Sequence, residues 1–94
     1  MNNVQRERIE DALNAIVEDL ARIEHERWSH WQMYMHEKGT RQPDGSLLLA
    51  RDLVERWDRQ IGTTYEKLSE KEKDGDREQV RKYLPLIVEA LARS

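Results

Sequence analysis

The chain of 94 residues contains no cysteine and no phenylalanine, and it has only two prolines and four glycines. The absence of cysteine excludes a disulfide framework and a thiolate metal site, and it fits a reducing compartment. No stretch approaches the ~20 apolar residues of a membrane-spanning helix, and the first residues lack the apolar core of a signal peptide. We therefore expect a soluble, cytoplasmic protein with no membrane partner.

An excess of charge of one sign is also missing. Charged residues make up 37% of the chain, both signs are interspersed, and the net charge is -3. A surface for duplex nucleic acid usually shows a basic balance or a basic stripe, so no duplex partner is expected. Hydrophobic residues are another 37%, enough for a small core in a single domain over residues 1–94. Such a core is marginal, and a homodimer that buried part of the apolar surface would stabilise it.

What the sequence does contain is helical periodicity. Residues 4–38 are predicted to form one long helix, capped by Asn2 or Asn3 and stopped by Gly39. Its apolar side chains recur at spacings of three and four, the pattern of one buried stripe. They are Ile9, Leu13, Ile16, Val17, Leu20 and Ile23.

A turn region follows at residues 40–49. The run 42–46, Gln-Pro-Asp-Gly-Ser, is strong turn chemistry, because Pro presets φ and Gly supplies a positive φ. Residues 40–42 and 46–48 are expected to pair as a very small β-hairpin.

The second half of the chain predicts shorter helices. One is expected at residues 50–61, closed by Gly62, followed by a single turn at residues 63–68 with Thr63 and Glu66 at capping-box spacing. Ser69 and Glu72 form another capping box and open a last helical region. Pro85 predicts a break near residues 83–84 and a short terminal helix over residues 85–92. The expected fold is all-α, a compact bundle of one long N-terminal helix and three to four shorter helices.

Charged residues interrupt two of the apolar stripes. Glu24 and Arg27 continue the first stripe beside Trp28 and Trp31. Asp76 and Arg77 share a face of the last helix with Val80 and Leu84. Because unpaired charges in a core cost several kcal/mol, two arrangements are open. The four charges form an ion-pair network, or they line a polar ligand cleft between the first and last helices.

Signals for catalysis and metal binding are weak. His25, His30 and His36 are five and six residues apart, whereas two zinc ligands on one helix need a spacing of four. Ser29 and Ser46 have no base with an orienting group, and no glycine-rich loop precedes a helix. We expect a binding module that is not an enzyme, with no catalytic residues, no metal and no cofactor.

Three short motifs resemble a known family. Residues 21–28, with the core Glu-His-Glu-Arg-Trp, are similar to the first-helix motif of ryanodine-receptor (RyR) domains, an alanine followed by His-x-x-Trp. Residues 65–73 are similar to the family's Tyr-x-x-Leu-Ser-x-x-Glu-Lys segment. Asp76 and Arg77, followed by Val80, are similar to its closing helix. The inserted residues 47–61 depart from the family pattern.

The resemblance implies a small stand-alone RyR-like helical domain of the prokaryotic or phage type. Such a domain is proposed to recognise nucleotides or nucleotide-derived signals, often near defence systems of bacteria and phages, and it also acts as a protein-contact module. The matching positions are His25, Trp28, Tyr65, Asp76 and Arg77.

Two functions are therefore expected. In the first, Trp28 or Trp31 stacks a base of a nucleotide or cyclic nucleotide, and arginines meet its phosphate. In the alternative, the chain is a phage or prophage accessory protein that contacts a protein partner, or a second copy of itself, through its helical faces. The predicted ligand-binding residues are Glu24, His25, Arg27, Trp28, Trp31, Arg41, Tyr65, Asp76 and Arg77.

Overall fold

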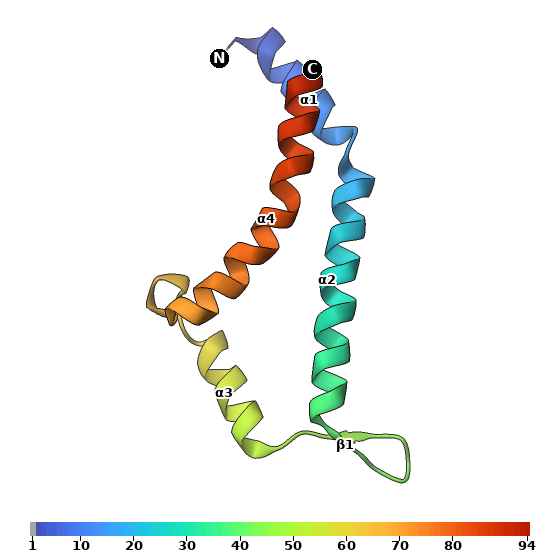
Figure 1. Ribbon diagram of the computed structural model, residues 1–94, viewed down its shortest axis with the longest axis vertical. Helices are drawn as coiled ribbons and strands as arrows, with labels where there is room; N and C mark the ends of the chain where they lie inside the picture. Colours follow the sequence, from blue (N-terminus) through green and yellow to red (C-terminus); the bar gives the residue numbers. More distant parts are fainter. Residues whose placement is uncertain (1) are drawn as a thin grey trace. The chain divides into compact units, whose positions relative to one another are not determined.

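The computed structural model describes residues 2–94, and these form an all-α fold with one tiny hairpin, as predicted (Figure 1). None of the helices within this range combines the length and apolar character needed to cross a membrane. The elements in chain order are α1 (Asn3–Asn14), α2 (Val17–Lys38), β1 (Thr40–Arg41), β2 (Leu47–Leu48), α3 (Arg51–Ile61), the 3₁₀ turn η1 (Tyr65–Lys67) and α4 (Glu70–Arg93).

The chain divides into two compact units, and the division passes through two helices. Unit 1 contains the residues up to Arg27 together with Asp76–Ser94, and unit 2 is Trp28–Gly75. Unit 1 therefore holds α1, the first half of α2 and most of α4. Unit 2 holds the rest of α2, the hairpin, α3 and η1.

The predicted N-terminal helix is present, but it is not continuous. Asn2 caps α1 in a reciprocal capping box with Gln5. The helix then ends at Asn14, and the Ile16 amide donates to the carbonyl of Leu13 in a tighter turn. The expectation of one helix over residues 4–38 is wrong at this point. No glycine or proline marks the break. Asn14 is a weak helix former, and the turn places Ile16 in a buried position, 5% exposed.

The hairpin forms between the two predicted segments, around the predicted turn. Thr40 pairs with Leu48 and Arg41 with Leu47 in antiparallel fashion. Gly45 adopts a φ of 88°, which a residue with a side chain rarely does. At the other end of the hairpin, Leu47 packs where a Cβ on Gly39 would lie, so Gly39 permits this close approach.

The capping predictions have mixed outcomes. Helix α3 spans the predicted range with Ala50 as its N-cap and Gly62 as its C-cap. Before α4, Ser69 and Glu72 form the predicted capping box. The Thr63–Glu66 box is absent, because the Thr63 hydroxyl donates to the Arg59 carbonyl instead.

Pro85 does not break α4. The helix runs from Glu70 to Arg93 with Pro85 inside it, so the predicted break at residues 83–84 is wrong. Proline removes one backbone bond, to the carbonyl of Arg81. Both Pro85 and Arg81 are exposed, and water can satisfy that carbonyl. Only one turn of the ladder is weakened, and the bonds on either side keep the helix continuous.

The core of unit 1 is very small. Among residues 2–94, the buried apolar residues are Ile16 and Ala90, each 5% exposed, and no polar residue is buried. By contrast, many large apolar side chains are exposed. They are Val4, Val17, Trp28, Trp31, Met33, Leu48, Val54, Ile61, Tyr65, Val80, Leu84, Val88 and Leu91.

Candidate functional site

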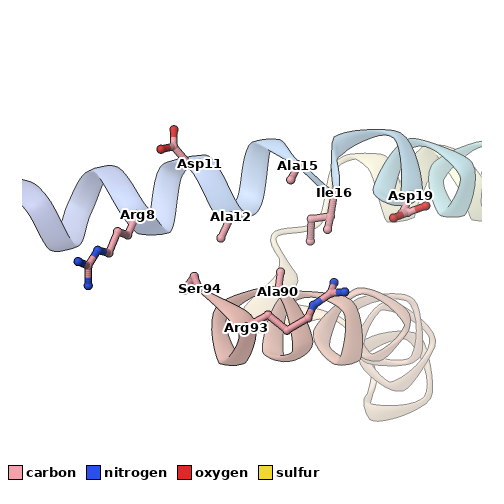
Figure 2. Close-up of a pocket in the computed structure, with 9 residues that line it drawn as sticks. All are labelled: Arg8, Asp11, Ala12, Ala15, Ile16, Asp19, Ala90, Arg93 and Ser94. Carbon is pink, nitrogen blue, oxygen red and sulfur yellow. The ribbon is translucent and has the colours of Figure 1, made fainter.

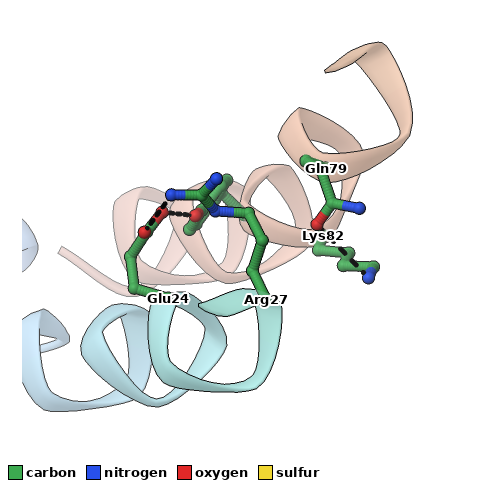
Figure 3. A network of polar contacts seen from close by, with 5 residues as sticks. Glu24, Arg27, Gln79 and Lys82 are labelled. Carbon is green, nitrogen blue, oxygen red and sulfur yellow. Dashed lines mark hydrogen bonds and ion pairs between the residues drawn. The ribbon is translucent and has the colours of Figure 1, made fainter. Parts of the chain in front are cut away.

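Within unit 1, Glu24 and Arg27 form an ion pair on α2. The Arg27 Nη2 atom lies 2.7 Å from Glu24 Oε2, as expected for residues three apart on a helix (Figure 3). The hydrogen bond from Arg27 to Glu24, and then the carboxylate charge, raise the pKa of Arg27 above its ordinary value. Partial burial opposes this and Asp76 adds to it. The guanidinium therefore remains charged at any physiological pH.

Tyr83 of α4 is the second partner of Glu24. Its hydroxyl donates to Glu24 Oε1, so both carboxylate oxygens of Glu24 are engaged by side chains of the protein. Tyr83 is not among the ligand-binding residues predicted from the sequence. A signal existed, because a tyrosine hydroxyl within an apolar stripe requires an acceptor. Of the four predicted charges, Glu24 and Arg27 are thus paired with each other, and Tyr83 of α4 joins this pair.

The network is at the surface and not on an inward face. The side chains of Arg27 and Glu24 are each about half exposed, and nearby on α4 Lys82 donates to Gln79 (Figure 3). Sequence periodicity placed Glu24 and Arg27 inward because they continue the aliphatic stripe of α2. In the structure both residues are exposed, so their charges remain solvated. Exposed pairs of this kind contribute about 0–1 kcal/mol.

Three other predicted residues also lie in unit 1. Asp76 is exposed on α4 and close enough for its charge to affect Arg27. Arg77 is half-buried and His25 is exposed on α2, and each of these two has an interaction of its own. Unit 1 thus brings together Glu24, Arg27 and Asp76.

In unit 2, Trp31 belongs to an aromatic cluster. Its ring stacks on Tyr34 with centroids 5.4 Å apart, and it meets Trp57 edge to face at 5.6 Å. Offset and edge-to-face pairs of this type stabilise packing by about 0.5–1.5 kcal/mol. Trp31 therefore has a structural role in unit 2, although part of its ring remains exposed.

Trp28 and Arg41 meet at a shallow groove in unit 2. The groove has a volume of about 500 Å³, and Trp28, 58% exposed, is part of its wall. The hairpin contributes Arg41, whose side chain also donates to the Gly45 carbonyl. The remaining lining residues come from one face of α2: Ser29, Gln32, Met33, His36 and Glu37.

Tyr65 lies apart from that groove. It begins η1, and the ammonium of Lys73 sits 5.6 Å from the centre of its ring. This cation–π contact packs η1 against the start of α4. Of the four predicted ligand residues in unit 2, the structure brings two to one groove, Trp28 and Arg41.

No metal centre is formed by residues 2–94, in which three or more histidine, aspartate or glutamate side chains never gather as a ligand set. Comparison with protein-family models, curated proteins and solved structures gives no significant match. The resemblance to RyR domains therefore stays a prediction from the three sequence motifs.

Proposed function

We propose that this protein is a non-enzymatic interaction module, whose helical faces bind an apolar helix of a protein partner. The observation that carries this proposal is the imbalance between buried and exposed apolar residues. Ile16 and Ala90 are buried among residues 2–94, whereas large apolar side chains are exposed on every helix. Because the chain's own core is this small, a partner that covers apolar surface of the folded state contributes substantially to stability.

The clearest such face is on α4. Val80, Leu84, Val88 and Leu91 are all exposed. At ~100° per residue they lie within about 80° of one another, along one stripe. Spacings of four, four and three are those of anchors that a partner helix uses in helix-in-groove recognition.

A different side of α4 faces the interior of unit 1. Ala90 is buried and Tyr83 and Ile87 are half-buried. The apolar arc of α4 is thus wider than its covered part. An amphipathic helix normally limits its apolar arc to the face that its own chain covers.

Adjacent residues on α4 allow a matched test of this proposal. Val88 is 64% exposed and Ile87 is half-buried. We expect Val88→Lys to keep the circular dichroism spectrum and Tm of the wild type, and to reduce binding of a hydrophobic dye. Ile87→Lys should lower the Tm markedly, because it places a charge in a covered position. Unfolding of the Val88→Lys protein would show that this stripe belongs to the chain's own core, and would reject the proposal.

A second candidate function is nucleotide binding, favoured by the groove that contains both Trp28 and Arg41. An exposed indole face can stack a base at ~1–3 kcal/mol, and a guanidinium fork suits a phosphate. This candidate places the ligand in unit 2. The broader prediction, a nucleotide cleft between the first and last helices, stays untested.

Calorimetry with mononucleotides and cyclic dinucleotides tests this second candidate. Binding should be lost in Trp28→Ala and weakened in Arg41→Ala, and it should persist in Arg56→Ala, a control in unit 2 outside this groove. Absence of heat and of thermal stabilisation with every nucleotide would remove it.

A further inference from the structure

A stripe with opposite charges at its centre runs along helix α1 and ends at its C-cap, Ala15. Val4, Arg8, Asp11 and Ala15 follow one another at spacings of four, three and four, so at ~100° per residue they lie within about 60°. All four are exposed, Val4 by 58%. Across residues 2–94, neither Arg8 nor Asp11 has an ion-pair partner for its side chain. We call these four residues the α1 stripe.

The α1 stripe borders a groove of unit 1. Figure 2 shows this groove between α1 and the C-terminal end of α4, with Ala12 and Ala90 facing one another across it. Its volume is about 620 Å³, and its apolar lining consists of small residues and one isoleucine: Ala12, Ala15, Ile16 and Ala90. Arg8, Asp11, Asp19 and Arg93 add two charges of each sign. The groove thus has an apolar floor, and the charged residues around it sum to zero net charge.

We propose that a second copy of this chain docks here, with the two α1 helices antiparallel about a twofold axis. In this arrangement Arg8 lies opposite Asp11 of the partner subunit, and Asp11 lies opposite Arg8 of the partner subunit. Val4 then covers Ala15 of the partner subunit, at the apolar floor of the groove. The inference rests on the proposed function in one respect, that the chain binds a protein through a helical face, and it names a second copy as the partner and α1 as the face.

Charge complementarity selects this occupant and this direction. In a twofold interface, if one residue contacts a second residue of the partner, that second residue also contacts the first residue of the partner. When the stripe Val-Arg-Asp-Ala is laid antiparallel on its own copy, valine meets alanine and arginine meets aspartate, so both contacts of each kind are favourable. Parallel pairing would place Arg8 against Arg8 and Asp11 against Asp11 of the partner subunit, and like charges at close range are unfavourable. Antiparallel pairing turns both contacts into ion pairs.

The size of α1 sets the expected strength. Twelve residues give a helix about 18 Å long, which is short for an interface that buries about 800 Å² per partner. We therefore expect a reversible dimer that dissociates on dilution through the micromolar range, rather than a permanent one.

A charge-reversal experiment tests the docking directly. The dimer dissociation constant is measured by sedimentation equilibrium for the wild type, Arg8→Asp, Asp11→Arg and an equimolar mixture of the two variants. Each single variant should raise the constant about tenfold, since it places like charges opposite each other twice per dimer. The mixture should recover the wild-type dissociation constant, because one chain then presents two carboxylates and the other two guanidinium groups.

Arg6→Asp is the matched control. It makes the same change in net charge on the same helix, but Arg6 lies on another face, where it pairs with Glu10 at 3.0 Å. Its dissociation constant should stay within about twofold of the wild type, because an exposed pair of this kind contributes little. Circular dichroism confirms that each variant keeps its helix content.

Three outcomes would overturn the inference: a wild type that stays monomeric up to ~1 mM, equal effects of Arg8→Asp and Arg6→Asp, or a mixture that fails to recover. None of these depends on the Val88→Lys result, so failure of the α1 docking is separable from failure of the proposed function.

Discussion

At the scale of single residues, the surroundings decide what each charge or aromatic ring does. Glu24 was selected from the sequence as a candidate ligand group, but its two oxygens accept from Arg27 and Tyr83. Trp28 and Trp31 are three residues apart on one helix, yet Trp31 packs against Trp57 while Trp28 remains at an open groove. Residue type alone did not separate these roles, because the neighbours come from other elements.

Two glycines give opposite predictions for the same substitution. A Cβ on Gly39 would meet the Leu47 side chain, and a Cβ on Gly75 has nothing within 4 Å. We expect Gly39→Ala to lower the free energy of unfolding by about 1–3 kcal/mol through overpacking. Gly75→Ala, in the interior of α4, should raise it by about 0.5–1 kcal/mol. Denaturant unfolding measures both, and equal effects at the two positions would contradict the packing of Leu47 on Gly39.

The pH dependence of stability should report on Glu72. Hydrogen bonds from Gln60 and then Ser69 lower the pKa of Glu72 below its ordinary value of 4.5. Stability from a depressed carboxyl pKa is fully present above 4.5 and is lost as the pH falls through the lower folded-state value. We expect Glu72→Gln to lower the Tm at neutral pH. It should have little effect on the Tm at a pH below both the unfolded-state and the folded-state pKa of Glu72. Thermal melts from pH 7 to about pH 2 check this, and a Tm difference that stayed constant with pH would contradict it.

At the scale of elements, periodicity and turn chemistry located most of the fold. Helix α3, the hairpin and the capping box of α4 match their predictions because each depends on residues close together in sequence. Two of the errors, at Ile16 and Pro85, concern whether a helix continues. That choice depends on packing and solvent exposure around one turn, which local sequence does not contain.

Pro85 offers a test at this scale. Because α4 is continuous through Pro85, Pro85→Ala should restore the backbone hydrogen bond to Arg81 without repacking. We expect the free energy of unfolding to rise by about 1–3 kcal/mol, with unchanged or higher helix content by circular dichroism. A loss of stability would contradict a continuous α4 and would indicate that Pro85 begins a separate terminal helix.

At the scale of the whole molecule, exposed apolar surface dominates. Large apolar side chains are exposed in both units. The buried apolar residues among residues 2–94, Ile16 and Ala90, both lie in unit 1. Composition predicted that a core of this size would be marginal, and it also predicted that a homodimer would help. Which faces remain uncovered could not be read from the sequence, since it depends on how α1, α2 and α4 share their apolar arcs.

If the chain dimerises through α1, its thermal stability must depend on concentration. A partner that binds the folded chain but not the unfolded chain stabilises the folded state by mass action. The Tm should therefore rise with protein concentration over the micromolar range. Arg8→Asp should flatten this dependence, and Arg6→Asp should preserve it. A wild-type Tm independent of concentration would contradict the dimer.

Local sequence was enough to predict the all-α class, the turn at residues 42–46, most helix boundaries and the candidate charged and aromatic residues. These follow from periodicity and from residue-specific φ preferences, which act over a few positions. Three further facts required the folded chain: Tyr83 donates to Glu24, Trp28 shares a groove with Arg41, and particular apolar stripes stay exposed. Those facts join residues far apart in sequence, where the outcome depends on packing between elements.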